Sequence, residues 1–161
     1  METAQWQRYS ALGGIGFAVL NVIGGAVGGQ PPSPDDSAAD IAKYSQDHAG
    51  GVKAAAVLGG ISAMLILWWM SGLWRRLSDA EDGRPRLAVA SVLALTLGGA
   101  MFLGSQAVMT ATALRIDELG EGSQIFYVLG SVLLGFAGFA IAVHLIATSA
   151  IAFRARLWNI G

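Results

Sequence analysis

Three polar side chains, Asn21, Gln106 and His144, lie within otherwise apolar stretches of the chain. An amide or an imidazole in hydrocarbon is costly unless it finds a hydrogen-bond partner, so such residues are the first candidates for a binding site. Amides orient uncharged ligands by donating and accepting hydrogen bonds, and an imidazole also binds protons and metal ions. These three residues are therefore the candidate ligand-binding residues.

Two of them fall deep inside the stretches that contain them. Counted at the helical rise from the flanking boundary, His144 lies about 15 Å and Asn21 about 18 Å inside. Ser62 and Thr96 fall at similar depths, so we expect these four side chains to share one polar layer near the bilayer centre. Gln106 lies nearer the other end of its stretch, where it could line a shallow cavity.

Three interpretations of this layer are open. The simplest is structural: His144 and Asn21 bond to each other, to Ser or Thr, or to backbone, and hold the helices in register. A small-molecule or proton-coupled site is the alternative, although the stretches contain no Asp or Glu to relay a proton. A haem site would need a second histidine at membrane depth, and His48 lies outside, so we expect no cofactor.

Catalytic patterns are absent from the sequence. There is no His-Glu-x-x-His, Gly-x-Ser-x-Gly or P-loop pattern and no cysteine, so we predict that the protein is not an enzyme. Asp40, Asp47 and His48 could converge on a divalent metal, but Asp47 and His48 are adjacent rather than one helical turn apart. We expect a solvated helix face there and no metal.

The distribution of charge predicts the elements that position these residues. Hydrophobic residues make up 54% of the chain and charged residues 13%, and four long stretches contain no Asp, Glu, Lys or Arg. Each can cross a bilayer as a helix, which satisfies its backbone hydrogen bonds internally. We predict a single transmembrane domain over residues 1–161, an all-α polytopic membrane protein whose four transmembrane helices form a bundle. The predicted spans are about 9–27, 55–74, 87–110 and 124–153.

Lysine and arginine are unevenly divided between the two sides of these spans. One side has seven (Arg8, Arg75, Arg76, Arg84, Arg86, Arg154 and Arg156) and the other three (Lys43, Lys53 and Arg115). The positive-inside rule predicts a multi-pass plasma-membrane protein with both termini in the cytoplasm. The net charge of -1 argues against nucleic acid as a partner.

The first span has an alternative interpretation as a cleaved signal peptide. Ala26, Val27 and Gly28 provide small residues at a plausible cleavage position. Only one arginine precedes the run and Asn21 interrupts it, so we prefer a retained span. Cleavage would leave three spans in the same orientation.

A short exterior amphipathic helix is predicted over residues 34–48. Ser33 is its expected N-cap and Pro34 its first residue, and Gly50 and Gly51 are expected to end it. Ile41, Tyr44 and His48 share one side at helical spacing. This side should rest on the bilayer surface or over the mouth of the bundle.

Small residues form a stripe along the first span. Its helix-packing members are Gly14, Ala18, Gly24, Gly25 and Gly28. Such stripes let helix backbones approach closely in lipid, and the two small-xxx-small pairs that start at Gly24 and Gly25 can also drive homodimers. We expect the stripe to contact protein, and a bulky residue at Gly25 to disrupt folding or assembly.

Several features occur in a suggestive order. Arg8 precedes a Gly/Ala-rich span, a Pro/Asp-rich exterior helix follows, and Trp74-Arg75-Arg76-Leu77 with Ala80-Glu81 comes after the second span. In this order the chain resembles a group of uncharacterised bacterial multi-span integral-membrane proteins of actinobacterial type. The resemblance implies a multi-span protein of unknown activity in a group that often continues into further helices. The chain could therefore be a shorter member or lack later spans.

Two functional hypotheses follow. The leading one is a non-enzymatic accessory or structural membrane component that acts through helix packing. Its partners would be the lipid bilayer and either a second copy of the chain or another membrane protein. The alternative is a small transporter, or a protein that binds lipid or another small molecule, with its site near Asn21, Gln106 and His144.

Overall fold

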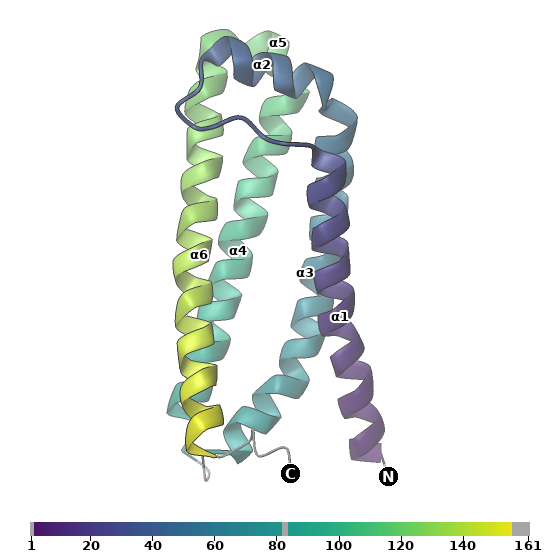
Figure 1. Cartoon of the computed structure of the whole chain (residues 1–161), viewed down its shortest axis with the longest axis vertical. Helices are drawn as coiled ribbons and strands as arrows, with labels where there is room; N and C mark the ends of the chain where they lie inside the picture. The colour runs from purple at the N-terminus through teal and green to yellow at the C-terminus, as the bar shows by residue number, and fades with distance from the viewer. Residues whose placement is uncertain (1, 82–83, 156–161) are drawn as a thin grey trace.

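The computed structural model of the chain describes residues 2–81 and 84–155, and this part contains helices and no strand (Figure 1). Arg156, which entered the charge count above, lies outside the described residues. The elements are α1 (Glu2–Gly28), α2 (Ala38–Asp47), α3 (Ala49–Asp79), α4 (Arg86–Leu114), α5 (Ile116–Leu119), the 3-10 turn η1 (Gly120–Gly122) and α6 (Ser123–Arg154).

Four of the helical segments are long and apolar enough to cross a membrane. They are Tyr9–Gly28, Ala49–Asp79, Arg86–Leu114 and Ile116–Arg154. Large apolar side chains such as Met64, Phe139 and Phe153 point outward and are at least 73% exposed, as a lipid-facing surface requires. The chain is an all-α multi-pass membrane protein, as predicted. Its helices extend past the predicted spans because the backbone stays helical through the polar residues that flank each apolar run.

The long helices form two pairs. α1 packs along α3 and α4 packs along α6, while α3 and α4 share a smaller contact. In Figure 1 the two pairs stand side by side and lie closest together near the α3–α4 turn. We call the opposite end, which α2 crosses, the α2 end. The packing within each pair leaves a space between the two pairs, and other side chains determine whether that space is filled.

The α3–α4 turn closes one end of this space. Leu77 of α3, Ala88 of α4 and Ile151 of α6 are at most 3% exposed and pack together. The Glu81 carboxylate accepts hydrogen bonds from the backbone N–H groups of Leu87 at 3.1 Å and Ala88 at 2.7 Å. A negative charge at the start of a helix satisfies unpaired N–H groups and complements the helix dipole, so Glu81 holds the turn against α4.

The exterior helix begins later than predicted. Ser37, not Ser33, is the N-cap of α2 and accepts a hydrogen bond from the N–H of Asp40 at 3.2 Å. Ser33 and Asp36 instead close a turn, in which the N–H of Asp36 donates to the Ser33 carbonyl at 3.0 Å. Since this turn uses the residues before Ser37, the predicted helical start at Pro34 is wrong.

The predicted glycine stop is also wrong. α2 ends at Asp47, and Gly50 and Gly51 lie inside α3. Gly51 packs directly on the Val27 carbonyl, where a Cβ atom would have no room. A left-handed glycine instead follows α1: Gly29 has a φ of 75°, a conformation that an L side chain rarely adopts.

α2 lies across the mouth of the bundle, one of the two predicted positions (Figure 1). Ile41 and Ser45 face inward and are at most 4% exposed. The Tyr44 hydroxyl donates to the Gly28 carbonyl at 2.7 Å, which fastens α2 to the end of α1. Burial raises the pKa of Tyr44 above its ordinary value. The segment 29–37 and α2 thus lie over both helix pairs, and we call them together the cap.

Candidate functional site

His144 is held between α4 and α6. It is 6% exposed, and its Nδ1 lies 2.8 Å from the Ser91 hydroxyl and 3.1 Å from the Ser91 carbonyl oxygen. The Ser91 hydroxyl also lies 3.1 Å from that of Thr148. The Trp69 ring of α3 meets the imidazole edge-on, with ring centroids 6.5 Å apart. His144 therefore joins the two helices of its own pair and faces a side chain of the other pair.

Asn21 has the same role in the other pair. Its Nδ2 donates to the Phe17 carbonyl at 2.8 Å and to the Ser62 hydroxyl at 3.1 Å. Ser62 of α3 is fully buried and donates in turn to the Gly59 carbonyl at 2.8 Å. Asn21 and His144 thus bond to serine side chains and backbone carbonyls, which are partners that the structural interpretation of these residues named.

The four side chains expected in one polar layer do not form one hydrogen-bonded cluster. Asn21 and His144 bond within different helix pairs and not to each other. Thr96 is exposed and donates only to the Val92 carbonyl of its own helix, at 2.9 Å. The depth argument predicted similar heights, but height along a helix does not say toward which neighbour a side chain points.

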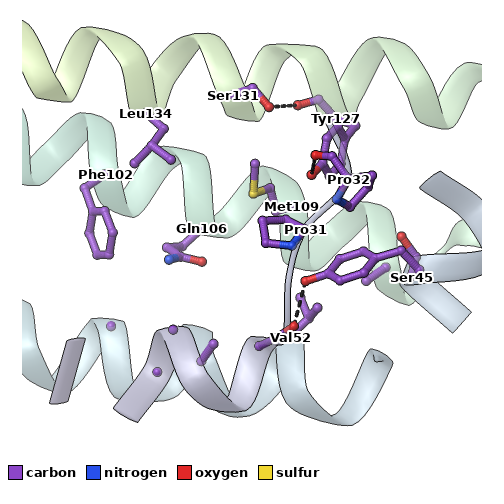
Figure 2. A pocket seen from close by; sticks show the side chains of 18 of the residues that line it. Pro31, Pro32, Ser45, Val52, Phe102, Gln106, Met109, Tyr127, Ser131 and Leu134 are labelled. Carbon is purple, nitrogen blue, oxygen red and sulfur yellow. Dashed lines mark hydrogen bonds between the residues drawn. The ribbon is translucent and has the colours of Figure 1, made fainter. Parts of the chain in front are cut away.

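A cavity of about 670 Å³ lies between the helix pairs beneath the cap. We call it the inter-pair cavity. Figure 2 shows Phe102 and Gln106 of α4 and Leu134 of α6 pointing across it toward α1 and α3. The residues that line it are Leu20, Asn21, Gly24, Gly25, Gly28, Gly29, Pro31, Pro32, Pro34, Tyr44, Ser45, Val52, Ala55, Gly59, Phe102, Gln106, Met109, Ala113, Tyr127, Ser131, Leu134 and Gly135.

Gln106 brings an unpaired amide into this cavity. Its side chain makes no hydrogen bond with the described residues, whereas the hydroxyls of Tyr44, Tyr127 and Ser131 already donate to backbone carbonyls. Asn21 uses only Nδ2 in its bonds, so its Oδ1 remains an acceptor. The cavity wall therefore offers a donor and acceptors to a ligand on an otherwise apolar surface.

The three predicted ligand-binding residues are thus divided. Asn21 and Gln106 both line the inter-pair cavity, from α1 and α4. His144 is not part of its lining and is bonded between α4 and α6 instead. The site that the geometry supports is Asn21 with Gln106, and His144 belongs to the packing of its helix pair.

The small-residue stripe of α1 is divided as well. Gly14 lies under the Trp69 ring, where a Cβ atom would come within 2.8 Å of Trp69 Cδ1. Gly24 and Gly28 lie against Ala55 of α3. Ala18 is exposed, and Gly25 lines the cavity with nothing within 4 Å of a Cβ atom. Gly25 is therefore not a packing residue within the chain. It differs from its neighbour Gly24 because successive residues of a helix point about 100° apart.

Other close-approach glycines were missed by the sequence analysis. A Cβ atom on Gly13 would come within 2.9 Å of the Leu65 carbonyl oxygen, and Gly72 of α3 leaves room for the Ser10 side chain. Applying the small-residue rule to the second span as well as to the first would have drawn attention to Gly72.

The residues considered for a metal site have other contacts. The Ser37 hydroxyl donates to the Asp40 carboxylate at 2.6 Å, and the His48 ring stacks on Tyr44 with centroids 4.8 Å apart. No three His, Asp or Glu side chains within residues 2–81 and 84–155 are placed to hold a metal ion.

Comparison with known protein families, with curated proteins and with solved structures finds no match to this chain. The resemblance to actinobacterial-type multi-span proteins stays a prediction. The class of the protein follows from its own architecture: a multi-pass helical membrane protein with a cavity between two helix pairs.

Proposed function

We propose that this membrane protein binds a small, largely apolar molecule in the inter-pair cavity and that it catalyses no reaction. The observation that carries the proposal is the cavity, whose volume of about 670 Å³ falls among those of ligand pockets, roughly 300–1,000 Å³. Such pockets combine apolar walls with a few placed polar groups. Gln106 and Asn21 supply those groups here.

Packing alone gives less support to the accessory-component hypothesis. Its predicted surface was the small-residue stripe of α1, but Gly14, Gly24 and Gly28 lie against α3 of the same chain. Gly25 faces the cavity. Of that stripe, Ala18 and Gly25 are left exposed for a partner to cover, and Gly25 also lines the cavity.

The proposal is tested by asking what the purified protein retains. Native mass spectrometry of the full chain in mild detergent should release a bound small molecule from the wild type. Gln106→Trp, which puts a bulky ring into the cavity and removes the amide, should carry the least, and Gln106→Leu should carry less than the wild type. The same spectra count the chains in each particle and so test the predicted second copy.

His144→Leu is the matched control, because it also removes a polar side chain from a membrane helix but lies outside the cavity lining. It should retain the molecule. In parallel, added 1-hexadecanol should raise the unfolding temperature of the wild type and of His144→Leu more than that of Gln106→Trp. A wild type that retains nothing and shows no shift would contradict the proposal.

We also propose that the protein lies in the plasma membrane with both termini in the cytoplasm. The excess of Lys and Arg on the side of the α3–α4 turn supports this orientation. Since the chain contains no cysteine, single substitutions can be labelled without background. A membrane-impermeant maleimide should label Asp47→Cys on intact cells, and Asp79→Cys only after permeabilisation. The reverse pattern would invert the topology.

A further inference from the structure

One side of the inter-pair cavity has no helix packing to close it. α3 and α4 contact each other at the cavity wall, where Gly59 of α3 lies against Phe102 and Gln106 of α4. α1 and α6, which stand in front of α3 and α4 in Figure 1, do not pack along one another. The lining residues on this side, Gly25 of α1 and Leu134 and Gly135 of α6, are exposed. Neither glycine has an atom within 4 Å of where a Cβ would lie. The cavity therefore opens sideways between α1 and α6.

This lateral opening lies at the level of the hydrocarbon. Gly25 is inside the apolar span Tyr9–Gly28, and Gly135 is inside the span Ile116–Arg154. Gly135 is twelve residues beyond Ser123, or about 18 Å along α6 at the helical rise. A molecule that passes between these two glycines comes from the lipid and not from water.

The cap closes the cavity toward the α2 end. Pro31, Pro32, Tyr44 and Ser45 of the cap form part of the cavity wall. Three hydrogen bonds from side chains to backbone carbonyls hold the cap in place: Tyr44 to Gly28 at 2.7 Å, Tyr127 to Pro32 at 2.7 Å and Gln124 to Asp36 at 3.2 Å. Access through the α2 end would require these bonds to break.

The lining also selects against charge. None of the described residues that line the cavity is Asp, Glu, Lys or Arg. An ionised group inside would lose its hydration without gaining a counter-charge, which strongly disfavours its entry. A hydroxyl or carbonyl group needs only one or two hydrogen bonds, and the free amide of Gln106 can both donate and accept them.

Resting on the proposed function, we infer that the cavity takes an uncharged single-chain lipid with one hydroxyl or carbonyl group, which comes from the bilayer through the opening between Gly25 and Gly135. The chain of this lipid occupies the apolar wall, and its polar group bonds to Gln106. The bound lipid exchanges directly with the surrounding membrane, so the cap does not have to open.

Photolabelling of the full chain in phosphatidylcholine vesicles tests this inference. The probe is a hexadecanol with a diazirine in its chain, and labelled peptides are identified by mass spectrometry. Occupancy of the cavity is measured as the labelling around Gln106 that is reached at long times and that excess unlabelled hexadecanol suppresses. The initial rate of that labelling measures access. Hexadecyl sulfate and hexadecyltrimethylammonium serve as charged competitors.

Variants at the opening should separate access from occupancy. We expect Gly25→Leu and Gly135→Leu to slow the initial rate by about tenfold. Their matched controls are Ala18→Leu and Gly138→Leu, exposed small residues of the same helices that do not line the cavity. The controls should label at the wild-type rate. Circular dichroism and elution volume verify that all four variants are folded.

Each contrary result has a distinct meaning. If the cavity is labelled but the opening variants react as fast as their controls, lateral access is overturned and the proposed function stands. If the charged competitors suppress labelling as well as hexadecanol does, the uncharged ligand class is overturned. If the wild type shows no competable labelling around Gln106, the proposed function fails and the inference falls with it.

Discussion

The two halves of the space between the helix pairs are built from the same four helices, yet one is filled and the other hollow. Toward the α3–α4 turn, the Trp69 ring reaches Gly14 of α1 and His144 of α6, and Leu77 packs with Ile151. Beneath the cap, the facing positions of α1 and α3 include glycines, and the cavity remains. Side-chain volume at the positions between pairs therefore decides where a cavity forms, while packing within each pair continues along its length.

Removing volume from the filled half should have the largest effect. Ile151 is 1% exposed, so Ile151→Ala should lower the free energy of unfolding by about 2–5 kcal/mol, measured by chemical unfolding in mixed micelles. Leu134→Ala is the matched change on the cavity wall, where the side chain is 47% exposed, and should cost about 0.5 kcal/mol or less. Equal losses would mean that the two halves are packed alike.

Adding volume to α1 sharpens the same contrast. Gly14→Leu should collide with the Trp69 ring and cost about 1–3 kcal/mol of stability. Gly25→Leu meets open space and should leave stability near that of the wild type. This outcome is opposite to the disruption expected from the stripe in the sequence. Strong destabilisation by Gly25→Leu would contradict this expectation and would indicate that a partner packs against that face of α1.

The polar residues should separate into stabilising and ligand-binding sets. His144→Leu and Asn21→Leu each remove a hydrogen bond between paired helices and should cost about 0.6–2 kcal/mol. Gln106→Leu loses no hydrogen bond within the described chain, so its stability should be unchanged while retention of the bound molecule falls. A destabilised Gln106→Leu that still binds would reverse these assignments.

The smallest effect is expected at the cap. Tyr44→Phe removes the hydrogen bond to the Gly28 carbonyl and should cost about 1 kcal/mol. Burial raises the pKa of Tyr44, so the fold favours the protonated hydroxyl. That contribution is fully present below the unfolded pKa of about 10 and is lost as the pH rises through the folded pKa. Subtracting the unfolding profile of Tyr44→Phe from that of the wild type should reveal this loss only above about pH 10; a constant difference would contradict it.

Hydropathy and charge determined much of this fold. Long apolar runs that are free of charge and lack the apolar/polar alternation of barrel strands form helices in lipid, so four membrane helices and a polytopic bundle follow from the sequence. The short cap helix was also predictable from its turn residues and polar pattern, although its start shifted to Ala38 because Ser37 rather than Ser33 caps it. The chemical types of the partners of Asn21 and His144 were predicted, since a buried amide or imidazole must find a hydroxyl or a carbonyl.

Only the tertiary structure decided which partners these are and where space remains. Asn21 selects Ser62 and His144 selects Ser91 because α1 packs on α3 and α4 on α6, a pairing that hydropathy along the chain does not encode. Both Gly24 and Gly25 line the cavity, but Gly24 lies against Ala55 of α3 while Gly25 meets open space, because each residue turns about 100° around the helix axis. Apolar runs set the number of helices, since the free energy of placing a segment in lipid is a sum over its own residues. The cavity depends on side chains from several helices meeting at one height, which is a property of their rotation and pairing.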